Sequence, residues 1–411
     1  MRRIVWLFST RIFCTNICIV TLSRYQSIVD APESDEIDYD SVDSGATKPT
    51  YAAIRVNDLL ESITDRYRTL ISLDEKIEFL INIQITIFSL LHSRLHDSLQ
   101  AYLSQAASIA RTVHGISKEA QADLRSFGGL ERLCRVYGSA EYLERKMSDW
   151  SDDIFFLELW DELQDRALAD SGRIVVGSMS LQYIEERTSG ALGHPEESGT
   201  LFDVTAVNYQ RLRTRAEASI QDMLSRSIRE LLRPYGSVNL WSSLSSVPSN
   251  SLALSAELDA TVQQLDEYLS FLAKVLSQVP LRRIVRHIAL IIQTYLWDSV
   301  LMRNTFSASG IAQFQRDIDA VWGTIDRWVG ERQGEMSMRK LKEALILMQL
   351  PVQNKNGNEG DKDVSPTLQE VDRKVFEDQV GAREVLDELG FEVLELRDVR
   401  NVLQRMIALG D

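Results

Sequence analysis

The longest regular hydrophobic pattern of the chain lies between residues 73 and 102. Apolar side chains recur there every three or four positions, with Gln84 as the polar member of the stripe, and this spacing predicts an amphipathic helix. Isoleucines at positions 81, 83, 85 and 87 also alternate with polar residues, as they would in a half-buried strand. No Gly or Pro interrupts residues 73–114. Because this run is far longer than a strand, we predict helix throughout.

Helical periodicity continues through most of the chain, divided by glycine, proline and polar segments. We expect breaks at 127–129 and at Gly138, and a helix cap at Asp149 or Ser151. Loops are expected at 190–199, 242–251 and 351–363. The remaining helices are predicted at 117–124, 129–147 with the break at Gly138, 154–163, 203–234, 258–276, 280–296, 311–328, 336–350, 367–380, 382–389 and 396–409.

Chain length and turn content indicate two helical bundles. A chain of 411 residues is longer than a domain with a single hydrophobic core usually is. A hydrophobic fraction of 44% supports a real core, while 20 Gly and 8 Pro provide too few turns for a many-stranded sandwich. We therefore predict an all-α fold, with a helical bundle over residues 51–235 and a C-terminal helical bundle over residues 236–411, in which the loop 351–363 is mobile.

Residues 1–50 have a different character from the rest. The first 25 residues carry four Arg and no acid, and their apolar stretch at 12–22 is too short for a membrane-spanning helix. A targeting peptide is one interpretation, but we favour a disordered or non-native N-terminal segment. Residues 30–43 are acidic and poor in apolar side chains, so we expect a flexible lead-in to the first helix.

Charge and cysteine usage restrict the partners and the compartment. A formal net charge of -15 repels phosphate backbones, so direct binding of nucleic acid is disfavoured. Cys14, Cys18 and Cys134 form neither an even disulfide framework nor a CxxC pair. This is typical of a chain in a reducing compartment, and we expect the protein to face the cytosol.

Few residues offer the chemistry of an enzyme or a metal site. His92 and His96 are spaced as two zinc ligands on a helix, but they lack the Glu of HExxH and a third ligand. Cys134 lies in an amphipathic segment and is expected to be buried. Residues 354–358 imitate a calcium loop without the Gly and the final Glu that such a loop needs. With no phosphate-binding glycine motif either, we predict no catalytic, cofactor-binding or metal site.

The densest aromatic cluster of the sequence lies at residues 150–160 and is flanked by acids. Core packing is the favoured role of these rings. A protein interface is the alternative, because exposed aromatic anchors contribute strongly to binding. The candidate interface consists of Trp150, Asp152, Asp153, Phe156 and Trp160.

Two groups of arginines could meet a partner of opposite charge. One group is at positions 211, 213 and 215, and the other at 282, 283 and 286. Each fits an acidic partner helix or an anionic lipid. Adjacent arginines on a helix point in different directions, so we favour a solvated face paired with local Glu for both.

Two long stretches of this sequence closely resemble the RINT/TIP family, particularly its fungal members. They are LLESITDRYRTLISLDEKIEFLINIQITIFSLLHSRLHDSLQAY at 59–102 and GLERLCRVYGSAEYLERKMSDWSDDIFFLELWDEL at 129–163. Weaker similarity follows in QRLRTRAEASI at 210–220 and REVLDELGF at 383–391. The resemblance covers most of the chain from about residue 57 onward. It rests on similarity of the amino-acid sequence rather than on a chemical motif.

The resemblance implies a non-enzymatic subunit of the Dsl complex, called NRZ in animals, which captures Golgi-derived COPI vesicles at the endoplasmic reticulum. It implies an elongated stack of antiparallel helical bundles, as in exocyst, COG and GARP subunits. The implied partners are other Dsl/NRZ subunits and endoplasmic-reticulum SNAREs, with membrane association only through those partners, on the cytosolic face of the endoplasmic reticulum.

The N-terminal region and a second candidate function qualify what the resemblance implies. Family members carry a longer N-terminal region whose helical segment pairs with the Dsl or ZW-ten partner. Residues 1–50 do not resemble that segment, so this pairing is not expected of a chain that begins at Met1. The alternative function is a checkpoint or DNA-repair adaptor acting through protein contacts, because animal members are also linked to a repair-complex partner.

Overall fold

A computed structural model describes residues 46–110, 127–169, 175–176, 179–194, 196–244, 253–352, 366–377 and 379–407. Helices dominate this part of the chain, which confirms the predicted all-α fold. Its two named strands, β1 (Val175–Val176) and β2 (Met179–Ser180), form a two-residue antiparallel ladder. This small ladder adds no sheet layer to the helical architecture.

The chain divides into two compact units, which are described separately. Unit 1 consists of Met1–Ile220 with Lys274–Ser277, and unit 2 of Gln221–Ala273 with Gln278–Asp411. The chain passes from unit 1 to unit 2 inside one long helix, α9 (Asp203–Gly236). The predicted boundary at 235/236 coincides with the end of that helix, and the domain limits 51–235 and 236–411 stay a prediction.

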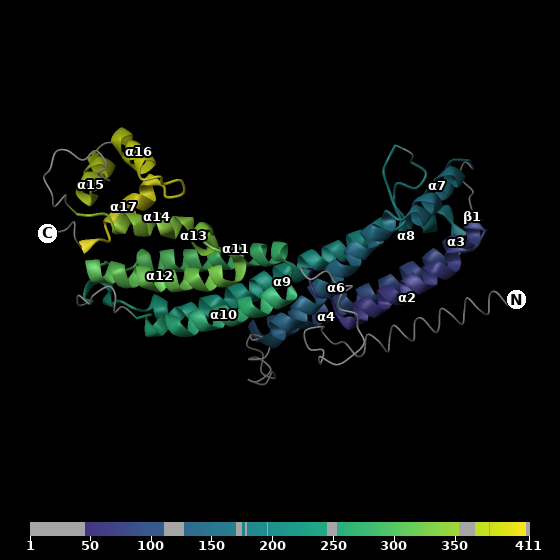
Figure 1. Cartoon of the computed structure of the whole chain (residues 1–411), viewed down its shortest axis with the longest axis horizontal. Coiled ribbons are helices and arrows are strands. Elements are labelled where there is room, and N and C mark those ends of the chain that lie inside the picture. The colour runs from purple at the N-terminus through teal and green to yellow at the C-terminus, as the bar shows by residue number, and fades with distance from the viewer. Residues whose placement is uncertain are drawn as a thin grey trace. The chain divides into compact units, whose positions relative to one another are not determined.

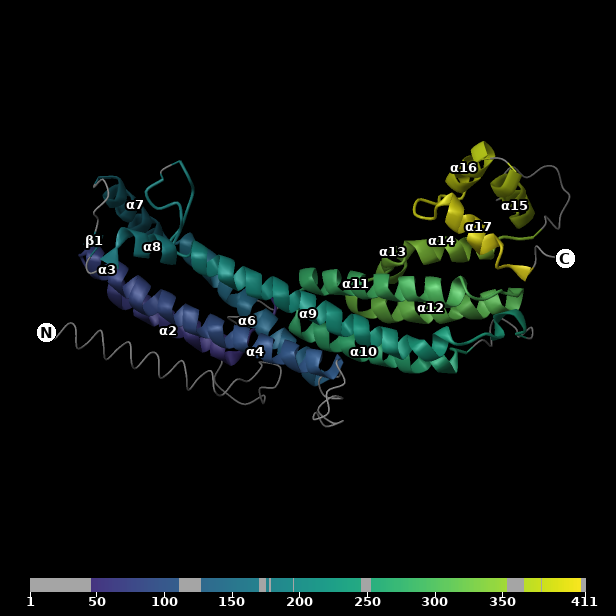
Figure 2. The same cartoon turned by 180° about the vertical axis from the view of Figure 1, so that it is seen from behind.

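The long helices of unit 1 lie side by side (Figures 1 and 2). Gln105 meets Arg132 at one end of the α4/α6 pair and the Phe88 ring meets Trp150 at the other, so these two helices run antiparallel. The elements of unit 1 before α9 are α2 (Tyr51–Arg68), α3 (Leu73–Phe79), the π-helix η3 (Leu80–Ile85), α4 (Thr86–Ala110), α6 (Phe127–Ser151), α7 (Ile154–Ala169) and α8 (Leu181–Arg187).

The isoleucine alternation at positions 81–87 lies in helix, as predicted. Helical hydrogen bonding continues from α3 through η3 into α4, with one π-helical segment. All four isoleucines are at most 2% exposed. Tyr67 of α2 bonds Gln84 of η3, and α8 also contacts η3. A helix covered on several sides buries positions two apart as well as positions four apart, which explains the strand-like pattern.

Two details of the α6 region correct the sequence prediction. Gly138 does not interrupt a helix, because α6 runs through it from Phe127 to Ser151. The following helix, α7, is capped neither by Asp149 nor by Ser151. Its cap is Asp153, whose Oδ1 accepts the amide of Phe155 at 2.8 Å.

Residues 46–50 are part of unit 1, so the predicted disordered segment 1–50 does not extend to them. Thr50 is 1% exposed and its hydroxyl caps α2 by accepting the amide of Ala53. The Thr50 hydroxyl also lies 2.7 Å from the Ser139 hydroxyl on α6. Residues 1–45 of that predicted segment lie outside the described residues.

Unit 2 contains the end of α9 and a second group of long helices. Ser227 bonds Tyr268, and Thr261 bonds the Leu231 carbonyl, so α9 and α10 run antiparallel. The elements after α9 are the 3-10 turn η4 (Leu240–Ser242), α10 (Ala256–Val275), α11 (Gln278–Leu296), the π-helix η6 (Trp297–Leu301), α12 (Ala308–Val329), α13 (Gln333–Ser337), α14 (Arg339–Met348), α15 (Leu368–Glu377), α16 (Gln379–Glu388) and α17 (Leu396–Leu403).

Two buried carboxylates hold loops of unit 2 in place. Asp317 is fully buried and accepts hydrogen bonds from the Tyr235 hydroxyl, the Ser255 amide and hydroxyl, and the Gln313 amide group. Glu343 accepts three consecutive backbone amides, at residues 392, 393 and 394. Both carboxylates receive enough donors to offset the cost of removing a charge from water, so their role is structural.

Four further sequence predictions lie wholly or mostly outside the described residues. They are the helix expected at 117–124, the calcium-like alternation at 354–358, and most of the loops 242–251 and 351–363. The predicted helix at 336–350 is present but divided into α13 and α14 at Met338.

Candidate protein-interaction site

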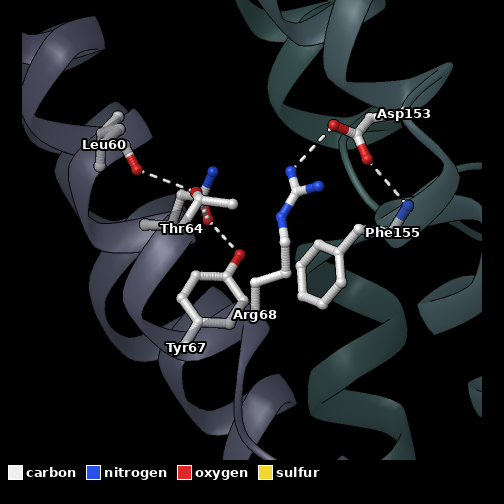
Figure 3. A network of polar contacts seen from close by, with 7 residues as sticks. Leu60, Thr64, Tyr67, Arg68, Asp153 and Phe155 are labelled. Carbon is white, nitrogen blue, oxygen red and sulfur yellow. Dashed lines mark hydrogen bonds and ion pairs between the residues drawn. The ribbon is translucent and has the colours of Figure 1, made fainter.

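The junction between α6 and α7 holds the residues predicted as a protein interface. α6 ends at Ser151 and α7 begins at Ile154, which leaves Asp152 and Asp153 in the turn between them. Asp153 uses one carboxylate oxygen to cap α7 and the other to bind Arg68 from the end of α2, at 2.9 Å (Figure 3). A single side chain therefore fixes both the start of α7 and its position against α2.

The charge of Asp153 is stabilised by these two contacts. Partial burial raises the pKa of the Asp153 carboxyl, but the hydrogen bonds from Arg68 and from the Phe155 amide, with the Arg68 charge, outweigh it. The pKa therefore lies below its usual value. The Arg68 guanidinium also lies 5.0 Å from the centre of the Phe155 ring, which adds a cation–π contact.

The aromatic side chains of the junction belong to the core of unit 1. Trp150, Phe156 and Trp160 are 9%, 2% and 8% exposed. The Phe156 ring lies 5.0 Å from Phe202 and 6.1 Å from Trp150, measured between centroids. The burial of these three rings agrees with core packing, the role favoured from the sequence. Of the five predicted interface residues only Asp152 is exposed, and Asp153 is partly exposed.

The exposed apolar side chains of this region are ones that the sequence interpretation did not select. Ile154 is 72% exposed and Leu157 45% on the outer face of α7, and Ile71 is 97% exposed three residues after Arg68. Glu158 and Asp161 lie on the same face of α7 and are also exposed. Residues 154, 157, 158 and 161 share one helical face. Apolar residues lie on nearly all sides of this helix in the sequence, so the sequence alone does not show which face is exposed.

A buried polar network stabilises the α2 side of the site. The Tyr67 hydroxyl donates to Gln84 Oε1 at 2.5 Å. The Thr64 hydroxyl donates to the Leu60 carbonyl at 2.8 Å (Figure 3). Gln84 is the polar member of the long apolar stripe and lies in the π-helix η3. Burial raises the pKa of the Tyr67 hydroxyl well above its usual value, so the group stays protonated and remains a donor.

The residues with metal-ligand or nucleophile chemistry do not come together. The His92 and His96 rings lie 6.3 Å apart, and no group of three or more His, Cys, Asp or Glu within the described residues could hold a metal ion. Burial raises the pKa of the Cys134 thiol, which opposes formation of the reactive thiolate. Cys134 is buried, as predicted.

The two arginine groups differ in their surroundings. Arg213 forms a two-pronged ion pair with Glu144 of α6, at 2.6 and 3.2 Å. The predicted pairing with a carboxylate is present for this residue, but the carboxylate comes from another helix. In the second group, Arg282 and Arg286 are exposed and form no ion pair with any described residue.

No helix of the described residues is both long enough and apolar enough to cross a membrane.

Comparison with known proteins decides the family. The sequence pattern of the RINT-1/TIP-1 family is matched over residues 19–406. The chain belongs to the RINT-1/TIP-1 family. This confirms the resemblance seen in the sequence, and it applies to nearly the whole chain.

Relatives of this RINT-1/TIP-1 chain are longer than it is. A protein transport protein, tip20, from Schizosaccharomyces pombe (strain 972 / ATCC 24843) is 24% identical over 310 residues, which cover 72% of this chain and 39% of the relative. The crystal structure of the SNARE Sec20 bound to the Dsl1 complex subunit Tip20 aligns with a TM-score of 0.61 and 15% identity, over 96% of this chain and 57% of that chain. The structural likeness supports the helical fold.

Proposed function

We propose that this RINT-1/TIP-1 chain is a non-enzymatic part of a vesicle-tethering subunit that binds a SNARE and other subunits of its complex. The observation that carries the proposal is the family match over residues 19–406, together with the fold shared with the Tip20 subunit that was solved with Sec20. Golgi-to-endoplasmic-reticulum retrograde transport of COPI vesicles, on the cytosolic face of the endoplasmic reticulum, is the process in which we place it.

The internal chemistry of the chain suits a role in which surfaces rather than reactive groups act. Its buried carboxylates Asp317 and Glu343 are occupied by backbone and side-chain donors. Its buried thiol, Cys134, has a raised pKa. Such groups stabilise rigid helical units, and rigid units present binding surfaces in a fixed geometry.

We further propose that the outer side of the α6–α7 junction contributes to partner binding through Ile71, Asp152, Ile154 and Leu157. Exposed apolar side chains beside carboxylates fit a partner helix that carries apolar and basic side chains. This surface would be held in place by the buried rings Trp150, Phe156 and Trp160 and by the ion pair of Asp153.

Direct binding to a SNARE tests the function. The purified chain would be titrated with the purified cytosolic part of a Sec20-type SNARE from the same organism and followed by calorimetry and size-exclusion chromatography. We expect one complex with a dissociation constant of about 10 µM or tighter. The SNARE cytosolic part from an unrelated transport step is the matched control. Absence of a complex at about 100 µM of each protein, or equal binding to the control SNARE, would contradict the proposal.

A further inference from the structure

The outward face of α11 carries three arginines in an unusual setting. Arg282, Arg283 and Arg286 are all exposed, and Val279 and Leu290 are 72% and 52% exposed. Positions 279, 283, 286 and 290 lie on one face of a helix, and Arg282 borders that face. We name these five residues the arginine stripe.

The opposite face of α11 is locked into the core of unit 2. The side chains on this face that are at most 1% exposed are Leu281, Ile284, Val285, Ile288, Ala289, Ile292 and Leu296. The helix can therefore neither rotate nor withdraw without unfolding the unit. The arginine stripe is presented on a fixed, preformed scaffold, which lowers the entropic cost of binding a partner.

The charges of Arg282 and Arg286 are not neutralised by their own helix. The 19 residues of α11 contain no Asp or Glu, although the chain as a whole carries a formal net charge of -15. Arg282 and Arg286 form no ion pair with any residue that the structure describes. Elsewhere in unit 2 exposed arginines do find carboxylates, as Arg327 does with Asp266 at 2.8 Å and Arg339 with Glu392 at 2.6 Å.

A neighbouring helix of unit 2 places two more arginines beside α11, together with one exposed carboxylate, Asp222, three residues before Ser225. Ser225 of α9 lies 3.0 Å from His287 of α11, between the hydroxyl oxygen and Nε2, so this side of α9 faces α11. Arg229 and Arg233 follow Ser225 by four and eight residues and are exposed. This spacing places them on the side of α9 nearest α11.

We propose that the arginine stripe binds an acidic amphipathic helix of a partner protein. Arg282 and Arg286 are four positions apart, which matches carboxylates spaced by one turn on a partner helix. The guanidinium group offers paired donors for a carboxylate. Val279 and Leu290 at the two ends of the stripe would meet apolar side chains of the same partner helix.

The geometry favours a protein over a membrane surface. A helix that lies on a bilayer buries a broad apolar face among the lipids. The apolar face of α11 is already buried in the unit, and only Val279 and Leu290 of the stripe could enter a bilayer. The inference goes beyond the proposed function, because it concerns any partner that presents such a helix.

A charge-swap experiment tests the stripe in the full chain. The probe is a fluorescent helical peptide of about 20 residues with Glu at i, i+4 and i+7 and Leu on the same face, measured by anisotropy. We expect saturable binding that weakens with salt, and a loss of about tenfold or more in affinity for R282E/R286E. The same variant should gain affinity for a peptide with Lys in place of each Glu.

Two further proteins separate a local effect from a general one. The variant R373E/R397E makes the same charge change on the exposed surfaces of α15 and α17, and it should bind the acidic peptide as the unmodified chain does. The variant R282Q/R286Q removes the charge without reversing it and should show an intermediate loss. Circular dichroism melts of all variants would establish that each is folded.

Three results would overturn the inference. The first is an unchanged affinity of folded R282E/R286E for the acidic peptide, and the second is an equal loss in R373E/R397E. The third is flotation of the unmodified chain, but not of R282E/R286E, with vesicles of phosphatidylcholine and phosphatidylserine in equal amounts, with no peptide binding. That result would assign the stripe to a membrane.

Discussion

Gly138 of α6 lies directly against the backbone of Lys48. A Cβ atom at position 138 would come within 2.3 Å of the Lys48 carbonyl oxygen. The Lys48 amide in turn donates a hydrogen bond to the Val275 carbonyl at 2.8 Å, and all three residues belong to unit 1. A residue without a side chain at 138 is therefore what allows the segment before α2 to cross α6.

Gly138→Ala should lower the stability of unit 1. Alanine is the better helix former by about 1 kcal/mol, but the contact with Lys48 is with backbone and cannot be relieved by a rotamer change. We expect a net loss of about 1–3 kcal/mol in the free energy of unfolding, measured by chemical denaturation. Gly323→Ala in α12 is the control, because nothing lies within 4 Å of its Cβ position. That variant should be as stable as the original chain or slightly more stable.

Leu91→Asp should unfold unit 1, while Leu90→Asp should leave it folded. Leu91 is 0% exposed and Leu90 is 37% exposed on the same helix. An unpaired buried carboxylate costs several kcal/mol, whereas a half-exposed one stays hydrated. Leu269→Asp should have the same effect on unit 2, because Leu269 is also 0% exposed. Helical content by circular dichroism would check all three, and a folded Leu91→Asp protein would contradict the described core.

The Arg68–Asp153 pair predicts a pH-dependent contribution to stability. The folded-state pKa of Asp153 lies below its usual value, so the contribution is complete above the unfolded-state pKa of about 4 and is lost as the pH falls through the folded-state pKa. Because the pair is partly exposed, it contributes no more than about 1 kcal/mol. Asp153→Asn, compared with the original chain by denaturation, should differ most near neutral pH and least near about pH 2. A difference that is the same at every pH would exclude this assignment.

Ile154→Asp distinguishes the exposed from the buried side of the α6–α7 junction. Ile154 is 72% exposed, so this change should shift the melting temperature by only about a degree or two. It should weaken binding of a partner at the junction if that surface is used. Phe156→Asp, at a residue that is 2% exposed, should unfold unit 1 instead. Partner binding that is unchanged in a folded Ile154→Asp protein would remove the junction from the proposed binding surface.

Much of the fold could be predicted from the spacing of apolar residues. The long helices α4, α9, α10, α11 and α12 follow from stripes with the helical period and from the proline and glycine residues near their ends. Gly138 was misread because its reason lies in Lys48, which is 90 positions away in the chain. Local sequence reports helix propensity, but it does not report a close approach between distant segments.

The interaction site was harder to predict than the fold. Large aromatic residues such as those at 150–160 suit a protein interface as well as a core, and Trp150 and Phe156 are buried in the interior of unit 1. The side chains that are left outside, Ile154 and Leu157, follow only from knowing which face of α7 is covered. Likewise, three arginines in a sequence look the same whether or not a carboxylate is nearby, and only the structure separates Arg213 from Arg286.

The helix α9 contributes its first part to unit 1 and its last part to unit 2, and residues Lys274–Ser277 of unit 1 interrupt the sequence of unit 2. No single cut in the gene therefore yields both units intact. A premature stop codon at the end of α9 would deprive unit 1 of four of its own residues as well as deleting most of unit 2. A truncating mutation in the second half of the coding sequence should therefore destabilise both units of the folded protein.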